Sequence, residues 1–162
     1  MRRLVFGTVS ALLLTGTVIP TLVSTARAQM TASVKASAPF IVDSGLDRAI
    51  GDRHFITVAV TGFPLEQLSI ALPDDMRTLE AAKVTNQMGK EVEANVAITK
   101  GMVTINFPKP VAPNEFLKVT LSGVKMDHQG GTVLYRVSAI KTGLVGAIPI
   151  GTAMVRLLDS SS

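Results

Sequence analysis

The chain has 162 residues, with 16 lysines and arginines, 12 aspartates and glutamates, and no cysteine. This length has room for one ordinary domain, which excludes large multidomain machines. Without cysteine the protein cannot form a disulfide, ligate a metal through a thiolate or use a cysteine nucleophile. An apolar core must therefore stabilise the fold.

The first 28 residues have the pattern of a secretory signal peptide. The arginine pair 2–3 precedes an apolar run over residues 4–23, and Ala26-Arg27-Ala28 places small residues at a cleavage site before Gln29. We expect Sec-type export with cleavage after Ala28, which leaves 134 residues. If the leader were kept, residues 4–23 would serve as a membrane anchor.

Removing this leader also removes three arginines, so 13 basic residues face 12 acidic ones, a formal charge of +1. The basic residues are scattered singly. They form no basic patch that would bind nucleic acid and no basic run that would bind an anionic membrane. We therefore exclude nucleic acid as a partner.

After a flexible arm predicted over residues 29–38, six runs alternate apolar and polar side chains, the pattern of half-buried strands. They are residues 55–61, 68–72, 92–98, 103–107, 116–121 and 133–139. Val84 and residues 154–157 are weaker strand candidates. Residues 74–83 form the one stretch with apolar spacing for a short helix, with two aspartates at its N-terminal end.

Turn residues separate these runs. Lys100-Gly101 fits a tight hairpin, because glycine tolerates positive φ. Pro108, Pro110 and Pro113 crowd a predicted crossover, since closely spaced prolines cannot lie inside a central strand. The sequence predicts an all-β fold: an antiparallel immunoglobulin-like β-sandwich of about seven to eight strands, in a single domain over residues 39–162.

Three segments resemble a family of exported cyanobacterial domains of unknown function. They are the proline-flanked strand end at 107–113, the Gly-rich turn and strand at 130–139, and the glycine-containing strand at 150–157. The resemblance extends from about Ile56 to Leu158, although Leu157-Leu158 stands where the family has aromatic residues. It implies an immunoglobulin-like sandwich exported to the periplasm or the thylakoid lumen. It implies no activity and no functional residue.

The search for catalytic chemistry is negative, so we expect no enzyme and no catalytic residue. The sequence has no G-x-S-x-G elbow, no phosphate-binding G-x-x-x-x-G-K loop and no H-E-x-x-H pair. We interpret His54 and His128 as solvated loop histidines, and the 12 acidic residues as solvated turn carboxylates. A hydrolase is the third of the function classes that we consider.

Two metal sites were weighed and neither is favoured, so no cofactor is expected. Asp43, Asp47 and Asp52 could offer oxygens to calcium, but their spacing differs from a calcium-binding loop. Met126 and His128 could bind copper through thioether and imidazole. The methionines are dispersed along the chain, however, and we interpret most of them as residues that fill gaps in the core. A periplasmic copper carrier is the alternative function.

The remaining candidate is the apolar segment 144–151, which is too irregular for one regular strand. One interpretation is a loop that tucks its side chains beneath the sandwich. The other is an exposed patch that docks on a partner protein or membrane-protein surface, with Leu144, Val145, Ile148 and Ile150 as contacts. An open sheet edge is a second route to a protein partner. The sequence predicts an exported interaction module.

Overall fold

The computed structural model describes residues 38–47 and 52–158. The predicted leader and almost all of the predicted arm lie outside these residues. Within them the chain forms strands, and none of it is a helix able to cross a membrane. The strands are β1 (Phe40–Leu46), β2 (His54–Ala59), β3 (Leu65–Ala71), β4 (Met76–Thr78), β5 (Ala81–Asn86), β6 (Asn95–Thr99), β7 (Met102–Val111), β8 (Phe116–Ser122), β9 (Lys125–Met126), β10 (Thr132–Lys141) and β11 (Ile148–Arg156).

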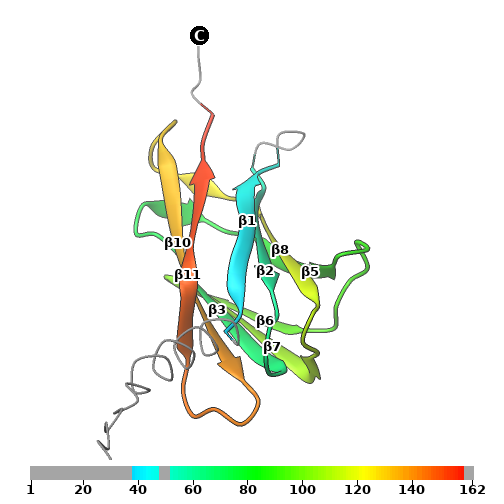
Figure 1. The fold of residues 1–162 in the computed structure, drawn as a ribbon. Coiled ribbons are helices and arrows are strands. Elements are labelled where there is room, and N and C mark those ends of the chain that lie inside the picture. The colour runs from blue at the N-terminus through cyan, green and yellow to red at the C-terminus, as the bar shows by residue number, and fades with distance from the viewer. Residues whose placement is uncertain (1–37, 48–51, 159–162) are drawn as a thin grey trace, which may run out of the picture.

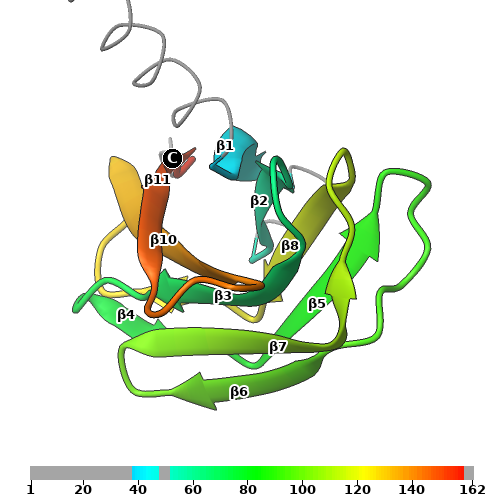
Figure 2. The same cartoon turned by 60° about the horizontal axis from the view of Figure 1, so that its bottom comes forward.

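Two antiparallel sheets face each other (Figures 1 and 2). One has the order β1-β2-β8-β5 and the other β11-β10-β3-β7-β6, while β4 and β9 form a small separate ribbon. Every pairing between strands is antiparallel. The predicted all-β, antiparallel immunoglobulin-like sandwich is confirmed, although its two facing sheets contain nine strands within the described residues and not the predicted seven to eight.

The core lies between the two sheets and follows the two-residue alternation of the sequence. Tyr135 is fully buried in the middle of β10, as its position between Val133 and Val137 predicted. On the opposite sheet, β2 and β8 bring their alternate aliphatic side chains inward. The fully or almost fully buried members of these strands are Ile56, Val58, Leu117, Val119 and Leu121.

The short helix that the apolar spacing of residues 74–83 would allow does not form. This stretch contains β4 and the start of β5. Met76 pairs with Met126 across the β4–β9 ribbon, and Ala82 pairs with Leu121 of β8. The spacing that suggested one apolar helix face belongs to two strands that bury against different neighbours, so tertiary pairing overrides the local pattern.

Pro108 and Pro110 were predicted to lie in a crossover but are inside β7, whereas Pro113 lies in the connection after it. The neighbouring strand β6 pairs with β7 only as far as Asn106, and the register with β3 shifts between Asn106 and Val111. Pro108 and Pro110 therefore fall where β7 has no regular ladder to join, which is where a strand tolerates a missing N–H.

The strand predicted over residues 92–98 begins later than expected, whereas the hairpin after it is as predicted. The run 92–98 becomes strand only from Asn95 onward, because the Val92 N–H donates to the Val84 carbonyl of β5 instead (3.0 Å). The predicted Lys100-Gly101 hairpin is confirmed: Thr99 pairs with Met102, and Gly101 has a φ of 88°.

The strand β1 was not predicted, because Asp43, Ser44 and Gly45 interrupt its apolar pattern. It lies beside β11 at the front of Figure 1, where each strand forms the edge of a different sheet. The Ser44 hydroxyl donates to the Met154 carbonyl (2.9 Å) and accepts from the Met154 N–H (3.1 Å). One side chain thus links two edges that share no ladder.

Candidate functional site

Three loops meet at one end of the sandwich, which we call the loop end. They are residues 60–64, 112–115 and 142–147, joining β2 to β3, β7 to β8 and β10 to β11. The Thr142 N–H donates to the Pro64 carbonyl (2.9 Å), and the Asn114 N–H donates to the Val60 carbonyl (2.8 Å). These bonds join the loops to one another, so their exposed side chains form one surface.

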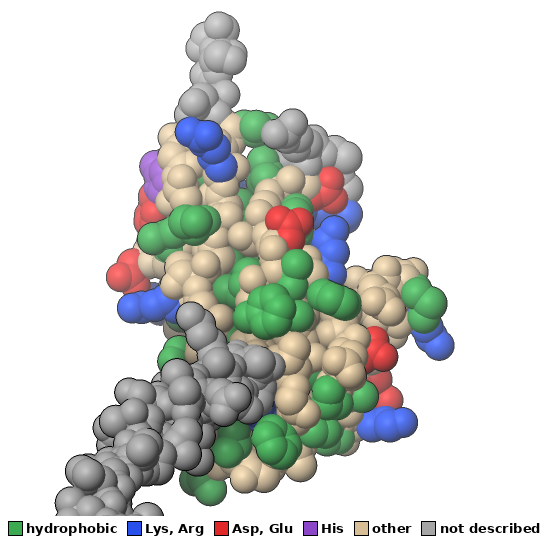
Figure 3. Space-filling view, in the orientation of Figure 1, with side chains coloured by type: hydrophobic (Ala, Val, Ile, Leu, Met, Phe, Trp, Pro, Cys, Tyr) green, Lys and Arg blue, Asp and Glu red, His purple; other side chains and the backbone are tan. Residues whose placement is uncertain are grey.

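The loop end carries large apolar side chains that are open to solvent. Phe63 is 54% exposed, Leu144 45% and Val145 fully exposed. Two further phenylalanines begin the adjacent strands, Phe40 in β1 and Phe116 in β8. Figure 3 shows hydrophobic side chains gathered toward this end, at the bottom of the view. A cluster of exposed aromatic and aliphatic groups is characteristic of interaction surfaces.

Strand register places the two strand phenylalanines in a row. Ala59 of β2 pairs with Phe40 on one side and with Phe116 on the other. Ala59 is only 4% exposed, whereas the two rings beside it are 50% and 39% exposed. Because Ala59 is small, the rings of Phe40 and Phe116 lie on either side of it on the outer face of the sheet. Sequence reasoning missed this row because β1 was not predicted.

A buried cation supports the loop end from beneath. Lys141 ends β10 with only 3% of its surface exposed, and its ammonium lies 5.0 Å from the centre of the Phe63 ring. Cation–π contacts gain strength when the cation is removed from water. Lys141 therefore holds the Phe63 loop against the strand that leads into Leu144.

The structure separates the four predicted contact residues into two pairs. Leu144 and Val145 lie in the loop and are exposed, so the interpretation that the whole segment tucks beneath the sandwich does not hold for them. Ile148 and Ile150 belong to β11, are partly buried and pack against the core.

The irregularity predicted for segment 144–151 is a β-bulge in β11. Val137 pairs with Gly151 and Ser138 with Pro149, which leaves Ile150 as the extra residue. Gly151 has a φ of 143°, and a Cβ built on it would lie 3.2 Å from Ile41 Cδ1. The bulge therefore needs glycine both for its backbone conformation and for the close approach of β1.

A second candidate site is a cavity of about 410 Å³ near the β9–β10 connection. His54, Met126 and His128 all contribute to its lining, together with Arg77 and Lys125. The interpretation of His54 as a solvated loop residue is wrong: it begins β2 and is 2% exposed. Sequence reasoning could not place the two histidines in the same cavity, because 73 residues separate them.

His54 makes its hydrogen bond inside the core. Its Nδ1 and the Tyr135 hydroxyl lie 2.5 Å apart, and the two rings meet edge to face. Burial lowers the pKa of His54 from 6.5 to about 4, against the opposing effect of the Asp52 carboxylate. Burial likewise raises the pKa of Tyr135. At neutral pH both groups are uncharged, and His54 is bonded to a phenol and not to a serine hydroxyl of the kind found in a Ser-His-Asp triad.

His128 is exposed, as predicted, and its Nδ1 lies 3.0 Å from a carboxylate oxygen of Asp75. Beside it Arg77 pairs with Asp127. In the residues that the structure describes, no three histidine or acidic side chains come together as metal ligands. Of the three aspartates considered as calcium ligands, Asp43 accepts a bond from the neighbouring Ser44 N–H.

No protein-family model and no curated protein matches this chain. Among solved structures it is similar to the N-terminal domain of a Streptococcus gordonii adhesin (14% identity, TM-score 0.48, covering 75% of this chain and 32% of that one). It is similar to BcpA, the major pilin subunit of Bacillus cereus (17% identity, TM-score 0.45, 74% and 40%). It is also similar to the collagen-binding domain of a Staphylococcus aureus adhesin (6% identity, TM-score 0.43, 74% and 97%). The chain spans less than half the length of the first two.

Proposed function

We propose that this protein is an exported, non-enzymatic interaction module that docks on a partner protein through the loop end. The exposed apolar cluster there carries the proposal, with Val145 fully open to solvent and Phe63 more than half exposed. The loops are joined by backbone hydrogen bonds and supported by Lys141. A surface held in place in this way loses little conformational freedom on binding.

The chemistry of the surface favours a partner with an apolar patch of its own. Burying a valine or leucine side chain contributes about 1.5–3 kcal/mol. Loss of one such contact would therefore weaken binding by about tenfold to a hundredfold. Both a membrane protein and another exported protein can present such a patch. We propose contact with protein and not with lipid.

The test compares capture of the partner by the wild-type chain and by a Val145→Asp variant. Partners are cross-linked in the native host and identified from the wild-type sample. Val145→Asp should lose the captured protein while its melting temperature stays within a few degrees, because the residue is exposed. Met88→Asp is the matched control, since Met88 is 80% exposed in the turn after β5. Equal capture by all three proteins, or binding to protein-free lipid vesicles, would contradict the proposal.

Ile148, although it is one of the four predicted contact residues, is unsuitable for this test. That residue packs against the core, so Ile148→Asp would place a carboxylate in a partly apolar site and would destabilise the fold as well as any docking contact. Val145→Asp separates docking from packing, because only the exposed surface changes.

The domain organisation belongs to the same proposal: a leader over residues 1–28, an arm over 29–38 and the sandwich domain over 39–162, delivered to the periplasm or the thylakoid lumen. Mass spectrometry of the protein from its native host should find an N-terminus at Gln29. A peptide that spans Arg27 to Met30 in most of the recovered protein would count against cleavage.

Metal binding is the second candidate function, favoured by one observation: His54, Met126 and His128 line the same cavity. Imidazole and thioether are ligands that suit copper. Arg77 and Lys125 line that cavity as well, and their positive charges oppose a bound cation. We therefore place a copper carrier second.

A further inference from the structure

The outer edge of β6 has no hydrogen-bonded strand beside it within the described residues, although β6 also comes close to β5 of the opposite sheet. The edges of β1 and β11 lie side by side and are linked by Ser44. The edge of β5 is covered by its own following turn, where the Val92 N–H donates to the Val84 carbonyl. No strand within the described residues pairs with β6 on the side away from β7. Figure 2 shows β6 at the rim of its sheet.

The register of the β6–β7 hairpin identifies the groups that this edge presents. Leu72 donates its N–H to the Gly101 carbonyl of the hairpin turn (2.8 Å), and Ile70 pairs with Val103 in the same register. Bonding in an antiparallel ladder alternates along each strand. Val103 therefore bonds toward β3, and its partner on the other side, Ile98, directs its N–H and C=O outward.

The same alternation applies two residues earlier in β6. Val96 pairs with Ile105 and also directs both backbone groups away from β7. Ala97 lies between Val96 and Ile98 and bonds inward. The open edge thus offers two N–H donors and two C=O acceptors. They come from residues two positions apart, which is the spacing that another antiparallel strand requires.

The sequence of this edge contains none of the usual obstacles to pairing. Natural edge strands are protected by charged side chains, prolines, bulges or a covering segment. The five residues of β6 are uncharged, contain no proline and are all exposed, and their register with β7 is unbroken. Val96 and Ile98 are 37% and 38% exposed.

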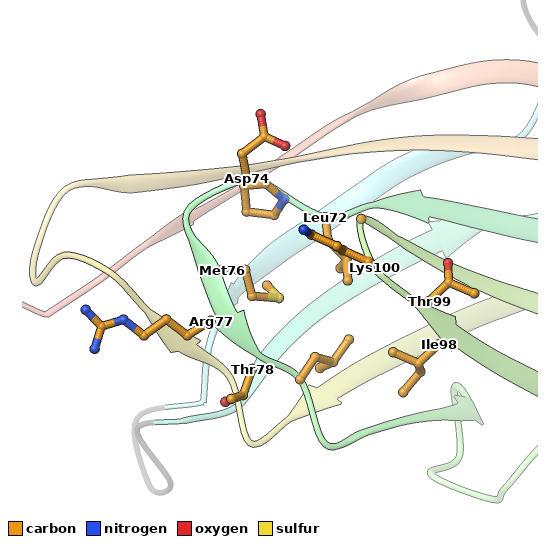
Figure 4. A pocket seen from close by; sticks show the side chains of 11 residues that line it. Leu72, Asp74, Met76, Arg77, Thr78, Ile98, Thr99 and Lys100 are labelled. Atoms are coloured by element: carbon orange, nitrogen blue, oxygen red, sulfur yellow. The ribbon is translucent and has the colours of Figure 1, made fainter.

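A cavity lined by both apolar and polar side chains lies beside this edge. It has a volume of about 430 Å³ and lies between β6 and the β4 segment. Figure 4 shows Leu72, Met76 and Ile98 lining it, whereas the charged ends of Asp74 and Arg77 point away. A strand added to the edge would extend the sheet next to this opening and cover part of it.

We infer that the open edge of β6 pairs antiparallel with the same edge of a second copy of this chain. The edge is complementary to itself when the two strands pair in the register that places Ala97 opposite Ala97 of the other copy. Val96 of each copy then lies opposite Ile98 of the other, and their outward groups form four ladder hydrogen bonds. Asn95 faces Thr99, so polar meets polar at both ends of the pairing.

The charges that flank β6 favour the same arrangement. Glu93 precedes the strand and Lys100 follows it, and both are exposed. Antiparallel pairing about Ala97 brings Glu93 of one copy to the end of the interface where Lys100 of the other copy lies. A parallel arrangement would instead bring like charges together, which costs energy. The result is a two-fold symmetric dimer with one continuous sheet.

The position of Ala97 on the two-fold axis supplies a sharp test. In the dimer Ala97 faces its own copy with Cβ atoms about 4.5–5.5 Å apart. Ala97→Lys alone and Ala97→Glu alone should each give monomers in analytical ultracentrifugation, because like charges meet. An equal mixture of the two variants should restore the dimer. Wild type should be dimeric.

Asn106→Lys and Asn106→Glu are the matched controls, because Asn106 is exposed one strand farther from the edge. Both should remain dimeric, and all variants should melt close to wild type. Three results would overturn the inference: a monomeric wild type at every concentration reached, a dimer that the Ala97 variants leave intact, or a mixture of the two Ala97 variants that stays monomeric. Docking at the loop end does not depend on this interface, so each proposal can fail alone.

Discussion

Acid should destabilise this protein through His54, a residue that combines almost complete burial with a hydrogen bond to Tyr135. Removal from water disfavours the charged imidazolium, and the pKa of His54 is lowered from 6.5 to about 4. In the unfolded chain the same side chain is solvated and has its ordinary pKa near 6.5. The two states therefore bind protons differently in acid.

The sign follows from this difference. Between pH 6.5 and pH 4 the unfolded chain binds a proton that the folded chain does not. The stability linked to neutral His54 is complete above pH 6.5 and is lost as the pH falls toward 4. A difference of about 2.5 pH units corresponds to about 3 kcal/mol in total, at about 1.4 kcal/mol for each pH unit within the window.

Urea unfolding at several pH values between about 7 and about 5 measures this effect. The free energy of unfolding of wild type should fall more steeply with decreasing pH than that of His54→Gln, by about 1.4 kcal/mol per pH unit near the middle of the window. His128→Gln should keep the wild-type slope, because His128 is exposed. NMR titration of the His54 ring gives the folded pKa directly. Equal slopes for wild type and His54→Gln would refute the reasoning.

Two further measurements address the core and the metal candidate. Tyr135→Ala should reduce the free energy of unfolding by about 3 kcal/mol, through lost burial and the cavity left behind; a change below about 1 kcal/mol, the size of a surface effect, would argue against its place in the core. Copper ions should leave the melting temperature unchanged in wild type and in His128→Ala, since Arg77 and Lys125 line the same cavity. A copper-dependent rise that His128→Ala abolishes would promote metal binding to the first function, because a ligand that binds only the native state stabilises it.

The alternation of apolar and polar residues determined much of the sandwich without reference to tertiary structure. The strands β8 and β10 follow their predicted runs closely, and Tyr135 is buried as its strand position required. The Lys100-Gly101 hairpin was also predictable, because its turn chemistry is local. In each case side chains two residues apart share a face, and one face needs to be buried.

Tertiary structure decided the features that depend on neighbours far along the chain. Residues 74–83 became strand because β8 and β9 supply their pairing partners. His54 is buried because Tyr135, 81 residues later, places its hydroxyl beside the imidazole. Phe40 and Phe116 share a surface only through Ala59. Burial of a single residue and the partner across a sheet are set by non-local packing, which no local pattern of apolar residues contains.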